Sequence, residues 1–110
     1  MNIFIDFDKT ICPDYSGKTM PMENAIATIN DLYDAGHAIN IYSYRTNPDC
    51  EQVFGRTVPQ EIELMTNYLN KWHIKFHGFI LNKPLFDILI DDRSHNPQEV
   101  GWKAIAEKLL

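Results

Sequence analysis

Two carboxylates follow the first apolar segment of the chain: Asp6 and Asp8, in the sequence FIDFDKTI. Because successive side chains on a strand alternate between faces, residues two positions apart point the same way. Both carboxylates should therefore converge on one small volume. Like charges at such close range need an offsetting cation or a shared proton. This pair predicts a site that binds a cation or carries out acid–base chemistry.

The segments that must position this pair alternate between strand and helix. Short runs rich in β-branched and aromatic residues predict strands at 2–8, 37–43, 76–81 and 85–90. Apolar residues at helical spacing, with start and stop signals, predict helices at 21–36, 57–72 and 96–109. Thr57 and Gln60 form a capping-box pattern at the start of the second helix. Such alternation predicts an α/β fold, with a parallel sheet and helices on both of its faces.

Ligands of parallel sheets bind beyond the carboxyl ends of the strands. This rule adds several side chains to the pair, namely Ser43 and Arg45 after the second strand, Lys83 before the last strand, and Asp91 and Asp92 after it. Oxygen ligands without Cys or His suit Mg²⁺ better than zinc. With one carboxylate on Mg²⁺, an Asp can attack phosphorus while a second Asp moves protons. A hydroxyl, an ammonium group and loop amides would hold the phosphoryl oxygens.

Three segments resemble the four motifs of the haloacid dehalogenase-like (HAD) hydrolases. DFDKT is similar to the DxDxT first motif, IYSYR to the second, and NKPLFDILIDDR to the third-motif lysine followed by the fourth-motif acidic pair. The motifs occur in the family's order over nearly the whole chain, and the similarity is greatest to short members without a cap domain. It implies a three-layer Rossmann-like fold with strand order 3-2-1-4 and one catalytic domain over residues 1–110. The connections at 12–20 and 46–57 are too short to fold into a cap.

The resemblance gives individual residues a role. It implies that Asp6 is the nucleophile and a Mg²⁺ ligand, and that Asp8 is the general acid and base, with its carbonyl also at the metal. The implied phosphate-binding residues are Thr10, which also shapes its loop, Ser43 and Lys83. The implied further metal ligands are Asp91 and, directly or through water, Asp92.

Two residues leave alternatives open. Lys9 stands where the family usually has a small residue, most often Gly. Lysine is costly there if the backbone must adopt an angle reserved for Gly, and harmless if its side chain points outward. Arg45 either contacts substrate or pairs with a nearby acid.

The aromatic residues divide into two groups. The group expected in the core comprises Phe4, Phe7, Trp72, Phe79 and Phe86. The group expected in or beside the loops around the site, where one or more could contact a leaving group, comprises Tyr15, Tyr44 and Phe54.

Composition limits the partners. The net charge of −5 disfavours nucleic acid, and no apolar run reaches membrane-spanning length. We expect a cytoplasmic protein with reduced cysteines, because no basic stretch precedes an apolar segment.

The expected function is Mg²⁺-dependent hydrolysis of a small phosphomonoester, such as a sugar phosphate or a nucleotide. Residues 46–57 or a second subunit of a homo-oligomer could cover the open site. The alternatives are a receiver-like signalling module that accepts a phosphoryl group, which the order of the motifs disfavours, and a catalytically silent HAD-fold scaffold.

Overall fold

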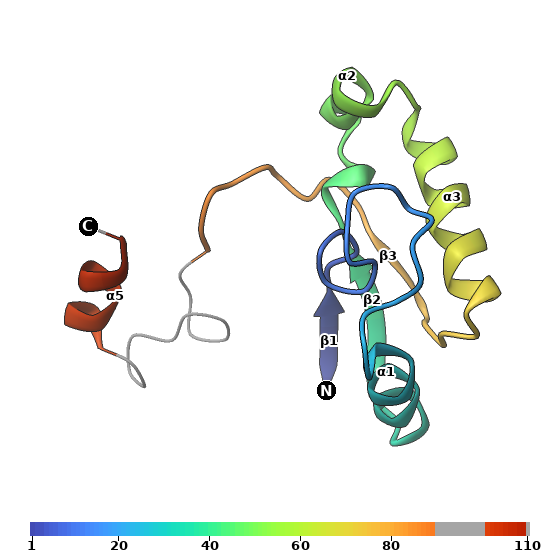
Figure 1. Ribbon diagram of the computed structural model, residues 1–110, viewed down its shortest axis with the longest axis horizontal. Helices are drawn as coiled ribbons and strands as arrows, with labels where there is room; N and C mark the ends of the chain where they lie inside the picture. Colours follow the sequence, from blue (N-terminus) through green and yellow to red (C-terminus); the bar gives the residue numbers. More distant parts are fainter. Residues whose placement is uncertain (90–100, 110) are drawn as a thin grey trace.

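The structure is a computed structural model that describes residues 1–89 and 101–109 (Figure 1). Strands and helices alternate along the chain, as the sequence predicts. The elements are β1 (Asn2–Ile5), α1 (Ala25–Asp34), β2 (Ala38–Tyr42), η1 (Tyr44–Thr46), η2 (Pro48–Cys50), α2 (Glu51–Phe54), α3 (Val58–Lys71), β3 (Gly78–Ile80) and α5 (Trp102–Leu109).

The three strands form one parallel sheet in the order β1-β2-β3. In the register of the sheet, Ile3 lies opposite Ile39, and Ile41 lies opposite Phe79. This arrangement confirms a small parallel α/β fold and agrees with the first three positions of the expected strand order. The carboxyl ends of the strands share one edge, as parallel pairing requires.

One face of the sheet carries the core. Ile39 and Ile41 of β2 are completely buried and belong to one apolar cluster with Ile29 of α1 and with Met65 and Leu69 of α3. Both helices therefore cover the same face. The capping box at the start of α3 is confirmed, because the side chains of Thr57 and Gln60 each accept a hydrogen bond from the other's backbone N–H.

The opposite face differs from the expectation. Phe4 of β1, expected in the core, is 54% exposed, and its ring packs against that of Tyr42 at a centroid distance of 5.5 Å. Alternation along β1 explains this, because Phe4 points away from the helix-covered face. In Figure 1, α5 lies apart from the sheet. Helices on both faces are thus not seen in the described part of the chain.

The expected fourth strand is a further correction. Residues 85–89 form no strand, and the last residue of that expected strand lies outside the described ranges. Asn82 adopts a left-handed conformation (φ 64°) and Pro84 has no N–H to donate, so neither residue continues the strand geometry of β3. Phe86, also expected in the core, is consequently 41% exposed.

The beginning of the last expected helix lies outside the described residues, and its later part forms α5. Among the helices that the structure describes, none has the length and apolar character needed to cross a membrane.

Candidate functional site

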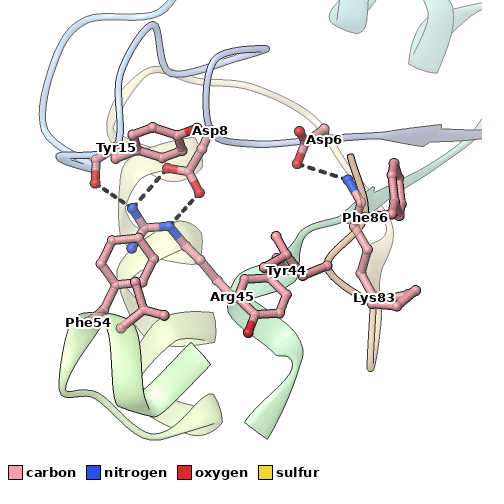
Figure 2. A pocket seen from close by; sticks show the side chains of 11 residues that line it. Asp6, Asp8, Tyr15, Tyr44, Arg45, Phe54, Lys83 and Phe86 are labelled. Atoms are coloured by element: carbon pink, nitrogen blue, oxygen red, sulfur yellow. Dashed lines mark hydrogen bonds and ion pairs between the residues drawn. The ribbon is translucent and has the colours of Figure 1, made fainter. Parts of the chain in front are cut away.

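A pocket of about 340 Å³ opens beyond the carboxyl ends of β1 and β2 (Figure 2). Its charged lining residues are Asp6, Asp8, Arg45 and Lys83. Parallel pairing brings these side chains together from distant parts of the sequence. This is the place where ligands of parallel sheets usually bind.

Asp6 is the first residue after β1, and its side chain is partly exposed to the pocket. Its Oδ1 accepts a hydrogen bond from the backbone N–H of Phe7 at 2.8 Å and lies 3.4 Å from Nζ of Lys83. The lysine ammonium also lies over the rings of Tyr42 and Phe86, at 5.2 and 5.6 Å from their centroids. Lys83 is therefore held beside Asp6 by one carboxylate and two aromatic faces.

Asp8 has a cation of its own. Nε and Nη2 of Arg45 donate to its two carboxylate oxygens, both at 2.8 Å (Figure 2). The arginine is completely buried, donates a third bond to the carbonyl of Tyr15, and lies 4.4 Å from the ring centroid of Phe54. The bidentate contact with a planar guanidinium fixes the orientation of the Asp8 carboxylate.

Behind Arg45 lies a second buried acid that sequence reasoning missed. Glu61 of α3 is completely buried and accepts hydrogen bonds from Nη1 of Arg45, at 2.8 Å, and from Nε of Arg56. Burial opposes the charge of Arg45, but the contacts with Asp8 and Glu61 outweigh it and raise the pKa of the guanidinium. A signal was present in the sequence, because Glu61 precedes Met65 by four residues and thus shares the apolar face of the helix.

Two residues with an implied phosphate-binding role lie outside the described pocket lining. Ser43 is buried, and its hydroxyl accepts a hydrogen bond from the backbone N–H of Arg45 at 3.2 Å, which caps η1. Thr10 is exposed and lines a separate depression beside α1, and its backbone N–H donates to the carbonyl of Phe7 at 3.3 Å. Asp6, Asp8 and Lys83 therefore line the pocket directly, and the phosphate-binding roles of Thr10 and Ser43 stay predictions. The remaining two candidates, Asp91 and Asp92, lie outside the described residues.

The open question about Lys9 has a structural answer. Its φ of 57° lies in the left-handed region, which glycine adopts more readily than lysine. The side chain nevertheless points outward, and Nζ lies 4.8 Å from the ring centroid of Tyr15. Lysine is therefore sterically accommodated at this turn at some cost in backbone strain.

The donor chemistry of the pocket fits a hard divalent cation such as Mg²⁺, because its described lining offers carboxylate oxygens without Cys or His. Oδ1 of Asp6 makes the contacts described above, which leaves Oδ2 available as a ligand atom. Both side-chain oxygens of Asp8 accept from Arg45. Within residues 1–89 and 101–109, no three His, Cys, Asp or Glu side chains gather as a complete metal cage.

Comparisons with known proteins bear on the fold alone. No protein-family model matches the chain, and no curated protein matches it. A crystal structure of a Vibrio cholerae protein, described only as an MCSG target, is similar with a TM-score of 0.67 and 20% sequence identity. The match covers 96% of this chain and 91% of the other. At this identity the match shows a shared α/β fold.

Proposed function

We propose that this protein is a Mg²⁺-dependent phosphomonoester hydrolase of the capless HAD-like type, with a Rossmann-like fold. The observation that carries the proposal is the pairing of Asp6 with Lys83 in a pocket at the carboxyl edge of the sheet. A carboxylate and an ammonium group 3.4 Å apart provide both an acceptor for a phosphoryl group and a positive charge for its oxygens. The order of the four motifs along the chain supports the same proposal.

The reaction proceeds in two steps on Asp6. In the first, an oxygen of Asp6 attacks phosphorus, the bond from phosphorus to the ester oxygen breaks, and Asp8 gives a proton to the leaving alcohol. In the second, Asp8 takes a proton from a water molecule that attacks the aspartyl-phosphate, which releases inorganic phosphate and restores Asp6. Asp6, the backbone carbonyl of Asp8, Asp91 and Asp92 would hold Mg²⁺, which would supply positive charge between the carboxylate and the anionic substrate.

Arg45 places a requirement on the first step. In the described arrangement, both oxygens of Asp8 accept hydrogen bonds from the guanidinium, as the oxygens of an ionised carboxylate do. To act as an acid, Asp8 must carry a proton on a lone pair that Arg45 does not occupy. Arg45 is therefore a positioning residue that fixes the orientation of the Asp8 carboxyl group.

The test is hydrolysis of phenyl phosphate with and without Mg²⁺, by the natural chain and by Asp6→Asn. A matched control is Asp34→Asn, since Asp34 is an exposed carboxylate on α1. We expect Mg²⁺-dependent release of phosphate that is lost in Asp6→Asn and kept in Asp34→Asn. Mass spectrometry of acid-quenched protein should find one phosphoryl group on the natural chain.

Other outcomes favour the alternatives. Stable phosphorylation of Asp6 without turnover would favour a receiver-like module, and the absence of both phosphorylation and turnover would favour a silent scaffold. Full activity in Asp6→Asn would refute Asp6 as the nucleophile.

A further inference from the structure

The walls of the pocket away from its charged residues are mainly aromatic and aliphatic. They are formed by Tyr15, Tyr44, Val53, Phe54, Leu85 and Phe86. These residues come from three separate segments, namely the loop after β1, the η1–α2 region and the chain after β3. Figure 2 shows Tyr15 and Phe54 on the Asp8 side of the pocket and Phe86 on the Asp6 side, beside Lys83.

Several of these side chains are exposed although they are large and apolar. Tyr15 is 56% exposed, Val53 64% and Phe86 41%. Isolated exposed apolar residues are common on protein surfaces, but here three separate segments contribute them to one concave site. Apolar walls around a few convergent polar groups are the usual composition of a small-molecule site.

The charges of the pocket limit what else a substrate can carry. Arg45 is completely buried, and four of its five N–H donors already bind Asp8, Glu61 and the carbonyl of Tyr15. Lys83 is the other cation of the described lining, and it stands beside Asp6, where the phosphoryl group would lie. A second phosphate would meet no further cation among the described lining residues.

The walls of the pocket also offer few polar side chains that could bind the hydroxyl groups of a substrate. Besides the charged residues, the described lining offers the two tyrosine hydroxyls as side-chain polar groups. Burial, together with the neighbouring Asp49, raises the pKa of Tyr44 above its ordinary 10.0. A hydroxyl-rich sugar would leave most of its hydrogen-bonding groups without protein partners, whereas a flat ring can stack on the aromatic side chains.

We propose that the site selects monophosphates that carry an aromatic ring system, as nucleoside monophosphates do, over sugar phosphates and bisphosphates. The phosphoryl group lies between Asp6 and Lys83, and the ring stacks on the aromatic walls that include Tyr15 and Phe86. This inference rests on the proposed function for the position of the phosphoryl group, but it is tested by binding and not by turnover.

The experiment measures dissociation constants by calorimetry with Mg²⁺ present and Asp6→Asn as the host protein, in which the proposed turnover is blocked. The probes are adenosine monophosphate, phenyl phosphate, glucose phosphate and fructose bisphosphate. We expect adenosine monophosphate to bind about 10-fold or more tightly than glucose phosphate, since one stacked base contributes a factor of this order. Phenyl phosphate should also bind more tightly than glucose phosphate.

Variants of the walls, made in the same host, identify the source of the selectivity. Tyr15→Ala should weaken binding of adenosine monophosphate by about fivefold or more and leave glucose phosphate unchanged. Phe86→Ala also removes a ring that contacts Lys83, so it should weaken both ligands, adenosine monophosphate more than glucose phosphate. Tyr15→Phe keeps the aromatic ring, so it should bind adenosine monophosphate with the same dissociation constant as the host protein. Met20→Ala is the matched control, because Met20 is 63% exposed and lies outside the described pocket lining. Both wall residues are exposed, so their truncation should not prevent folding.

Equal affinity for adenosine monophosphate and glucose phosphate, or no binding of either, would overturn the inference. An equal loss of both ligands in Tyr15→Ala would also overturn it. Selective binding of aromatic monophosphates without turnover by the natural chain would support the inference and refute the hydrolase. Turnover of sugar phosphates and aromatic phosphates with equal efficiency would support the hydrolase and refute the inferred selectivity.

Discussion

Replacement of Arg45 by Met is the perturbation with the largest expected effect on stability. The buried guanidinium donates four hydrogen bonds, two to Asp8, one to Glu61 and one to the carbonyl of Tyr15. Methionine has an apolar chain that can occupy much of the same space, so the variant mainly removes charge and donors. It leaves Glu61 buried with Arg56 as its remaining cation.

The magnitude follows from the burial of Glu61. Removal of one partner from a buried ion pair costs about 3–5 kcal/mol, because the remaining charge stays out of water. Small proteins have total stabilities of roughly 5–15 kcal/mol, so the loss is a large fraction of the whole. With an m-value of about 1–3 kcal/mol per molar urea, the urea midpoint should fall by at least about 1 M.

The assay is urea unfolding followed by circular dichroism, with Lys75→Met as the control. Lys75 and Asp34 form an ion pair whose side chains are 49% and 57% exposed, so its loss should cost at most about 1 kcal/mol. A second substitution, Glu61→Gln in the Arg45→Met background, should recover part of the loss because it removes the buried charge. A destabilisation by Arg45→Met no larger than that by Lys75→Met would refute the reasoning.

Three further predictions concern single residues. Lys9→Gly should increase the free energy of unfolding by up to about 1 kcal/mol in urea titrations, because glycine avoids the left-handed strain but has more freedom in the unfolded chain. Thr57→Ala should decrease it by about 1 kcal/mol through loss of the cap at Gln60, whereas Thr57→Ser should not. Burial raises the pKa of Tyr68 above its ordinary 10.0, so the folded chain keeps this proton at a pH where the unfolded chain loses it. The free energy of unfolding should therefore be retained below pH 10 and fall as the pH rises above 10. Urea titrations at several pH values should show this fall in the natural chain and not in Tyr68→Phe. At neutral pH, Tyr68→Phe should be less stable by about 1 kcal/mol, because the hydrogen bond from Tyr68 to the carbonyl of Thr19 is lost.

The sequence predicted best those features that depend on local periodicity and on strand ends. The capping box of Thr57 and Gln60 uses neighbouring residues, so its pattern alone was sufficient. Asp6 and Lys83 are distant in sequence, but both lie near the carboxyl ends of parallel strands, and the topology brought them together.

Features that depend on a distant partner could not be predicted in the same way. The apolar run at 85–89 resembles a strand, but a strand forms only where a sheet edge accepts it, and these residues do not join the described sheet. Glu61 gains its role from Arg45, which comes from a different segment.

The pairing of charges around the pocket has a consequence for how a ligand arrives. Asp6 faces Lys83, Asp8 faces Arg45, and Glu61 faces both Arg45 and Arg56, so carboxylates and cations are equal in number within this network. The whole chain nevertheless carries a net charge of −5, which repels an approaching phosphate ester over about a Debye length, roughly 10 Å at 0.1 M salt. Added salt weakens this repulsion, so encounter with the proposed substrate becomes faster as ionic strength rises, contrary to the behaviour of an electrostatically steered site.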